Sequence, residues 1–130
     1  MGLNMGKLIL SIDDSNVIKM SLELLCKENG YEFVHAFDGL EGLEKVEEIK
    51  NQSKNIALII CDINMPNMDG MEFLHHFKSH DENKFVPVLM LTTESQIGMM
   101  QEAKKMGATG WIVKPFQPEQ LLNFLKKFAR

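Results

Sequence analysis

The stretch Ile56-Ala57-Leu58-Ile59-Ile60-Cys61-Asp62 is an apolar run that ends in a carboxylate. A continuous apolar run of this length is typical of a strand buried on both faces of a parallel sheet. The segment that follows, residues 63–70, is rich in Asn, Pro, Asp and Gly, which favour turns. Asp62 therefore stands where a buried strand opens towards solvent, and from there a carboxylate can meet a ligand.

Three other apolar runs of strand length also end in residues that can do chemistry. Leu8–Ile12 is followed by Asp13 and Asp14, Val88–Leu91 by Thr92, and Gly110–Val113 by Lys114. A further strand, Glu32–Ala36, is shorter and more polar, which suits the edge of a sheet.

Segments with helical spacing of apolar residues alternate with these strands. Helices are predicted after Ser15 or Asp14, after Asp38, after Asp69, over Ser95–Met106 and from Gln117-Pro118 onwards. The alternation predicts an α/β, doubly wound, flavodoxin-like (βα)5 fold whose five-stranded parallel sheet has the order 2-1-3-4-5. In that order strands one, three, four and five are neighbours, so the residues that follow them should converge on one pocket.

Composition sets the class of protein. With 130 residues, 45% hydrophobic and 25% charged, the chain suits one globular domain. The net charge of -4 and the scattered basic residues argue against nucleic-acid binding. No apolar run approaches the roughly 20 residues that span a bilayer, so membrane insertion is not expected. Cys26 and Cys61 both stand in apolar contexts, which predicts buried free thiols and a cytoplasmic protein. We also expect a monomer.

The predicted pocket would gather three carboxylates, those of Asp13, Asp14 and Asp62. Carboxylates held this close repel one another unless a cation joins them. Oxygen ligands select hard cations, so Mg²⁺ is expected, with Mn²⁺ as a substitute. Asp62 could then attack an activated phosphorus atom, while Lys114 neutralises charge on the transferring group and Thr92 donates a hydrogen bond to it.

Across essentially its whole length the chain resembles a bacterial response-regulator receiver domain, and more narrowly a CheY-like one. The motifs that carry the resemblance are the acidic pair Asp13-Asp14, the segment Asp62 to Gly70, Leu91-Thr92, and Lys114-Pro115-Phe116 after Gly107-Ala108. It implies a receiver domain over residues 7–130, preceded by a short N-terminal extension, residues 1–6.

The resemblance also implies how the pocket works. Asp62 would be phosphorylated by a sensor histidine kinase, whose phosphohistidine is the donor. Asp13, Asp14, Asp62 and the backbone carbonyl of Asn64 would bind Mg²⁺, with Asp13 acting through water. A cis peptide bond before Pro115 would aim Lys114 into the site. Such a protein is a signalling switch rather than an enzyme, because it catalyses only its own phosphorylation and dephosphorylation.

Four further positions, Asn64, Glu94, Trp111 and Thr93, bear on how long the phosphate survives or on how the protein switches. Asn64 and Glu94 match chemotaxis regulators at the positions that tune how long the acyl phosphate survives. Trp111 stands where the family usually has a tyrosine or phenylalanine that switches, and an ordinary strand aromatic is an equal interpretation. Thr93 is larger than the usual residue there, and could narrow access for water or a phosphatase.

Output is expected to come from surface change, because the chain ends with the fifth predicted helix. Phosphate at Asp62 would pull Thr92 inward and let Trp111 move into the vacated space. That movement would remodel the face formed by the fourth helix, the fifth strand and the fifth helix. Candidate contact residues on this face are Ile97, Met100, Lys104, Trp111, Val113 and Lys127.

Several functions remain open at this stage. The leading hypothesis is a stand-alone switch in chemotaxis or motility control that acts on an output protein such as a motor switch component. A phosphorelay shuttle and a receiver belonging to a longer regulator are alternatives. A metal-dependent phosphohydrolase with an aspartate nucleophile is disfavoured, because such enzymes commonly place a second acid two residues after the nucleophile and Asn64 stands there.

Overall fold

In a computed structural model of the protein, the structure is described for residues 7–129. The elements follow one another in the order β1 (Leu8–Ile12), α1 (Asn16–Glu28), β2 (Glu32–Ala36), α2 (Gly39–Asn51), β3 (Ile56–Asp62), α3 (Gly70–Lys78), β4 (Val88–Thr92), α4 (Met100–Lys105), β5 (Gly110–Val113) and α5 (Pro118–Phe128). Two short 3-10 helices, η1 (Asp81–Asn83) and η2 (Glu94–Met99), precede β4 and α4. The predicted extension, residues 1–6, lies outside the described residues, and the domain boundary at residue 7 stays a prediction.

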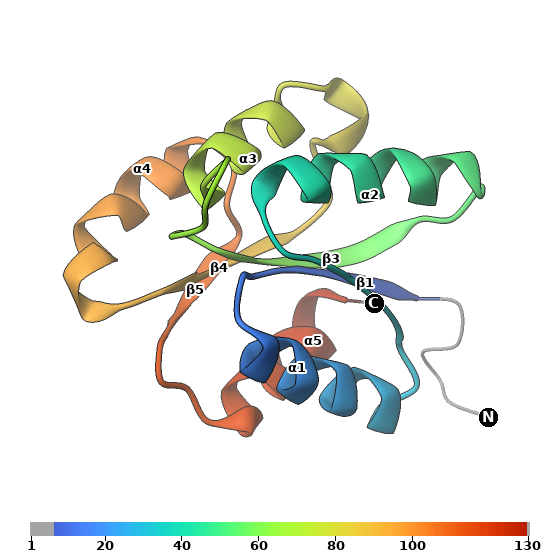
Figure 1. Cartoon of the computed structure of the whole chain (residues 1–130), viewed down its shortest axis with the longest axis horizontal. Coiled ribbons are helices and arrows are strands. Elements are labelled where there is room, and N and C mark those ends of the chain that lie inside the picture. The colour runs from blue at the N-terminus through green and yellow to red at the C-terminus, as the bar shows by residue number, and fades with distance from the viewer. Residues whose placement is uncertain (1–6, 130) are drawn as a thin grey trace.

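The five strands form one sheet in the order β2-β1-β3-β4-β5, and every neighbouring pair is parallel. Helices α2, α3 and α4 cover one face of the sheet, and α1 and α5 cover the other (Figure 1). This arrangement confirms the predicted doubly wound fold and its strand order. It also brings the carboxyl ends of β1, β3, β4 and β5 to one edge of the sheet.

The core consists of two apolar layers, one on each face of the sheet. Alternate side chains of β1 divide between them: Leu10 and Ile12 pack with α2 and α3, whereas Ile9 packs with α1 and α5. Phe73 of α3 is fully buried in the first layer and Leu121 of α5 in the second. Each such side chain contributes roughly 1.5–3 kcal/mol of burial free energy. The central strands are therefore packed on both faces, and this packing fixes the positions of the strand ends.

Side chains cap the helices that begin at this edge. Ser15, Asp38 and Asp69 each accept a hydrogen bond from the backbone N–H three residues later. Such caps are worth about 1 kcal/mol each. Of the two caps predicted for α1, Ser15 is the one used, which leaves the neighbouring Asp14 exposed. Asp69 is a helix cap, as the sequence predicts.

The predicted helix over Ser95–Met106 is wrong in its first half, because residues 94–99 form the 3-10 helix η2 and only Met100–Lys105 is α-helical. A 3-10 helix has three residues per turn instead of 3.6, so it rotates the side chains relative to an unbroken α-helix. The rotation turns Met100 and Ala103 into the core and leaves Met99 partly exposed.

Cys26 and Cys61 are buried free thiols, which confirms that prediction. Burial raises the pKa of Cys26 to about 12.

Within residues 7–129, none of the helices combines the length and the apolar content that crossing a membrane requires.

Candidate functional site

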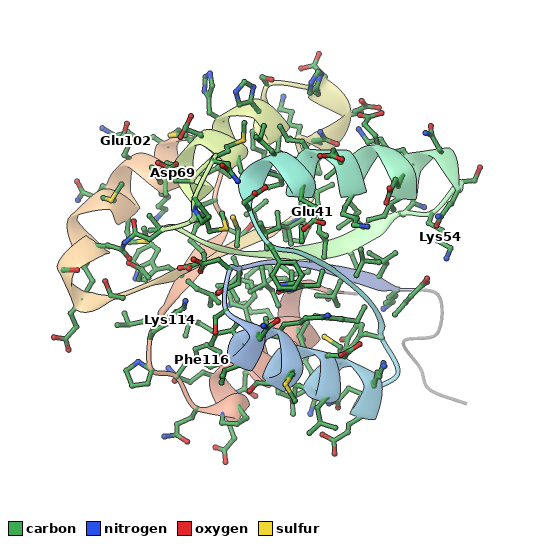
Figure 2. The ribbon with its side chains drawn as sticks, viewed as in Figure 1. Glu41, Lys54, Asp69, Glu102, Lys114 and Phe116 are labelled. Carbon is green, nitrogen blue, oxygen red and sulfur yellow. The ribbon has the colours of Figure 1, made fainter. Side chains whose placement is uncertain are left out.

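The sheet topology brings the predicted site residues together. Asp13 and Asp14 follow β1, Asp62 and Thr92 are the last residues of β3 and β4, and Lys114 follows β5. Lys114, labelled in Figure 2, follows the outermost strand β5, so β4 lies between it and the strand that carries Asp62. Groups from four separate strands therefore meet at one edge.

Lys114 forms ion pairs with two of the acids. Its Nζ lies 3.1 Å from Asp13 Oδ2 and 3.2 Å from Asp62 Oδ1. The two carboxylates are nearly inaccessible to solvent, so water screens these pairs little. The peptide bond between Lys114 and Pro115 is cis, as the family resemblance implies.

Burial and neighbouring charges shift the pKa values of Asp62 and Lys114. Burial raises the pKa of the Asp62 carboxyl, the Asp13 carboxylate raises it further, and the Lys114 ammonium only partly offsets both. Burial alone would lower the pKa of Lys114, but Asp13 and Asp62 outweigh it and the pKa is raised. One ammonium thus faces more carboxylates than it can neutralise.

The acidic cluster fits a hard divalent cation. Asp13, Asp14 and Asp62 each offer a carboxylate oxygen, and these oxygens all lie within 4.8 Å of one another. An all-oxygen donor set that is partly open to solvent suits Mg²⁺, which keeps several waters when bound to one or two carboxylates. Asn64 is exposed in the turn after β3, and the role of its carbonyl as a further ligand stays a prediction.

Thr92 is fully buried at the end of β4. Its hydroxyl donates to the backbone O of Thr93 at 3.1 Å, and its own carbonyl accepts from the backbone N of Lys114 at 2.6 Å. The second bond links the ends of β4 and β5. The hydroxyl must change its partner before it can serve a phosphoryl group on Asp62.

Most of the predicted partner face is accessible. Trp111 is 44% exposed, and it lines a surface hollow with Gln101, Lys104 and Lys105. Ile97 and Lys127 are exposed too, and Val113 is partly so. Met100 differs from its prediction as a contact residue: it is only 2% exposed and packs in the core in this structure.

The structure places a histidine, which the sequence analysis does not assign to the site, beside the acidic pair. His35 of β2 contacts the backbone O of Asp13 through Nε2, at 3.0 Å, and the hydroxyl of Ser11 through Nδ1, at 3.1 Å. Burial lowers the pKa of its imidazole, although the bond to the Asp13 carbonyl opposes this. The available signal was Ser11, a hydroxyl within an apolar strand that needs a partner once it is buried.

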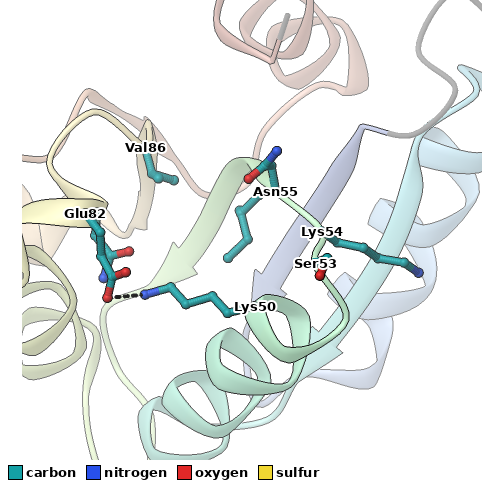
Figure 3. A pocket seen from close by; sticks show the side chains of 8 residues that line it. Lys50, Ser53, Lys54, Asn55, Glu82 and Val86 are labelled. Atoms are coloured by element: carbon teal, nitrogen blue, oxygen red, sulfur yellow. Dashed lines mark ion pairs between the residues drawn. The ribbon is translucent and has the colours of Figure 1, made fainter.

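A second hollow, of about 380 Å³, lies at the opposite end of β3. Lys50 reaches Glu82 across it at 2.9 Å (Figure 3), and Lys54 pairs with Glu32 at 2.6 Å. Both lysines that line this hollow are thus already neutralised. The acidic edge is the better candidate for a functional site.

Comparison with known proteins agrees with this geometry. The family model of the response regulator receiver domain matches residues 9–126. The chemotaxis protein CheY of Listeria monocytogenes is 34% identical over 123 residues, which cover 94% of this chain and 98% of the relative. The sporulation initiation phosphotransferase F of Bacillus subtilis is 32% identical over 124 residues, which cover 95% and 94%.

A solved structure of the chemotaxis response regulator CheY4 of Vibrio cholerae has a TM-score of 0.82 and 42% identity, and the match covers 94% of this chain and 98% of that one. The family match over residues 9–126 includes Asp13, Asp14, Asp62, Thr92 and Lys114. The chain therefore belongs to the family of response regulator receiver domains, and within it to the CheY-like members.

Proposed function

We propose that the protein is a stand-alone two-component response regulator. A sensor histidine kinase phosphorylates Asp62 in the presence of Mg²⁺, and the phosphate switches a protein-binding face. The observation that carries this proposal is the meeting of Asp13, Asp62 and Lys114 from three strands within ion-pair distance. Receiver domains are signalling switches of this class, which supports the proposal.

The geometry of Asp62 indicates which oxygen attacks. The backbone N–H of Ile63 donates to Oδ1 at 2.9 Å, and the Lys114 ammonium pairs with the same oxygen. Oδ2 is therefore the better nucleophile. It forms the new O–P bond as the P–N bond of the donor phosphohistidine breaks, and the electron pair of that bond leaves with the imidazole.

The remaining groups of the site stabilise the transferring phosphoryl group. Bound Mg²⁺, held by Asp13, Asp14 and Asp62, would neutralise negative charge there. The Lys114 ammonium adds a second positive charge from the side of β5. The Thr92 hydroxyl leaves the Thr93 carbonyl and donates to a phosphoryl oxygen.

Residues at the rim of the site set the lifetime of the acyl phosphate. Asn64 and Glu94 are both exposed, so their side chains can contact incoming water or a phosphatase. Thr93 is exposed beside them, and its hydroxyl hydrogen-bonds Ser95 and Gln96 at the start of η2. In this proposal Asn64 and Glu94 tune hydrolysis, and Thr93 narrows the approach.

Intact-mass spectrometry tests the proposal. Protein incubated with a small acyl-phosphate donor and Mg²⁺ is expected to gain one phosphoryl group per chain, and to gain none when EDTA removes the metal. The gain should stop at one group, and small phosphoesters should not be turned over. Sustained phosphoester turnover would instead indicate a phosphohydrolase, and no gain with Mg²⁺ present would refute the proposal.

Chemotaxis or motility control is the favoured pathway, because the relatives from Listeria and Vibrio are chemotaxis regulators. The Bacillus relative, a sporulation phosphotransferase, favours a relay shuttle as the second candidate. A pull-down from lysate with and without a beryllofluoride mimic of the phosphate separates them. Retention of a motor switch component would support the first function, and retention of a histidine phosphotransfer protein would support the second.

Trp111 is expected to report the switch. It is the only tryptophan of the chain, so its emission follows one ring. On phosphorylation the indole should move from its exposed position into the space that Thr92 vacates, and its emission should shift to shorter wavelength. Asp62→Asn, which cannot be phosphorylated, is the control. Unchanged emission from protein shown by mass to carry phosphate would exclude this route.

A further inference from the structure

His35 connects the edge strand β2 to the end of β1 through both nitrogens of its ring. Its Nε2 lies 3.0 Å from the backbone O of Asp13, and its Nδ1 lies 3.1 Å from Ser11 Oγ. Ser11 is the residue directly opposite His35 in the parallel pair. Ser11 and Asp13 are fully buried and His35 is half-buried, so both bonds are partly shielded from water.

These partners fix the tautomer of the neutral ring. A carbonyl oxygen can only accept a hydrogen bond, so Nε2 must carry the hydrogen. Nδ1 then accepts from the Ser11 hydroxyl. Phe33 stacks at 6.1 Å between ring centroids and Phe37 packs edge-on at 4.7 Å, which also restrains the ring. The imidazole is thus held both by its hydrogen bonds and by its neighbours.

The carbonyl that His35 holds belongs to the peptide group between Asp13 and Asp14. On the other side of Asp13, its backbone N donates to the O of Ala36 at 3.0 Å. Strand β2 therefore hydrogen-bonds both the backbone N and the backbone O of Asp13, at the point where the chain leaves the sheet.

These two hydrogen bonds to the Asp13 backbone matter most for the position of Asp14. The Asp13 carboxylate has its own partners, the backbone N–H of Ser15 and the Lys114 ammonium. The exposed Asp14 side chain, in contrast, accepts no hydrogen bond from residues 7–129, so what the fold fixes is the backbone at Asp14 and with it the direction of the Cα–Cβ bond. From that backbone position one Asp14 carboxylate oxygen lies within 4.8 Å of those of Asp13 and Asp62, so the orientation of the Asp13–Asp14 peptide group bears on the acidic cluster.

We propose that His35 is a positioning residue of the cation site. Its Nε2–H bond to the Asp13 carbonyl orients the following peptide, and so directs Asp14 towards a divalent cation shared with Asp13 and Asp62. This inference rests on the proposed function, because it concerns the same cation site. It assigns a role to a residue that touches neither the cation nor the phosphate.

Calorimetric titration with Mg²⁺ tests the role in the full chain. His35→Leu, which removes both hydrogen bonds, is expected to weaken Mg²⁺ binding about tenfold, as losses of partners behind metal ligands do. His35→Gln, whose amide N–H can reach the same carbonyl, should recover most of the affinity. Phe33→Leu, on the same strand and face, is the matched control: it should lower the melting temperature but leave the affinity close to that of wild type.

The outcomes separate this inference from the proposed function. A folded His35→Leu protein that binds Mg²⁺ like wild type would overturn the inference and leave the proposed function intact. A wild-type protein that binds no Mg²⁺ would overturn both. If His35→Leu does not fold, NMR of the imidazole nitrogens in the wild type decides: an Nε2–H tautomer supports the role, and an Nδ1–H tautomer contradicts it.

Discussion

Asp62→Asn is expected to abolish phosphorylation completely while the protein stays folded. The amide keeps the size of the side chain and can still accept the Ile63 N–H bond, but it is not a nucleophile. Intact-mass spectrometry with a small acyl-phosphate donor and Mg²⁺ should therefore show no added phosphoryl group. Asp69→Asn, in the same turn, is the matched control, because Asn also caps helices and the variant should be phosphorylated like wild type. A phosphoryl group found on Asp62→Asn would place the acceptor elsewhere.

The same variant has a second consequence, which is visible without phosphate. In metal-free buffer, burial and the Asp13 carboxylate raise the pKa of Asp62 in the folded protein. The folded state then binds this proton more tightly than the unfolded state, so the free energy of unfolding falls as pH rises from the ordinary carboxyl range through the raised pKa. Asp62→Asn has no carboxyl group at this position, so it does not lose stability in this way as the pH rises. It should be more stable than wild type in urea at neutral pH, and the difference should close in acid.

The sequence predicts which groups meet at this site because parallel strands all end at one edge. The residues at the ends of the apolar runs therefore include the site residues Asp62 and Lys114, although other strands and helices separate the two along the chain. The orientation of a side chain is a different matter. Nothing in the sequence shows that the Thr92 hydroxyl bonds the Thr93 carbonyl, because rotamers depend on the packed surroundings.

The positions of Met100 and His35 differ from what the sequence pattern indicates, for physical reasons. Met100 is buried although the sequence predicts it on the partner face. The 3-10 helix before it has a different angle per residue from an α-helix, and apolar spacing alone does not reveal such a change. The contacts of His35 do not follow from its own stretch of sequence, because its partners belong to another strand. The pairing of Ser11 with His35 depends on strand register, which no short stretch of sequence contains.

Gly70→Ala is expected to disturb both the fold and the site, because a Cβ at position 70 has no room. That carbon would overlap the carbonyl O of Asp62, and it would lie 2.9 Å from the carbonyl C of Asp62 and from Cα of Ile63. All of these are backbone atoms, so no flexible side chain can move aside. The backbone N of Gly70 also donates to the O of Ile63 at 2.7 Å, which holds the two segments together.

Relief of this overlap requires α3 to withdraw from the end of β3, or Asp62 to shift. The cost should be about 3 kcal/mol in the free energy of unfolding, at the upper end of what overpacking costs in cores. A shift of Asp62 by even about 1 Å would slow its phosphorylation on the order of 100-fold. Urea unfolding and the rate of mass gain with an acyl-phosphate donor measure the two effects separately.

Gly98→Ala is the matched control, because a Cβ at position 98 in η2 meets no atom within 4 Å. Its stability should stay within about 0.5 kcal/mol of wild type, as for most surface substitutions. A loss confined to Gly70→Ala would show that the close approach of α3 to the end of β3 places the phosphoacceptor. Equal stability of the two variants would mean that α3 can withdraw at no cost, and the position of Asp62 would then not depend on glycine at position 70.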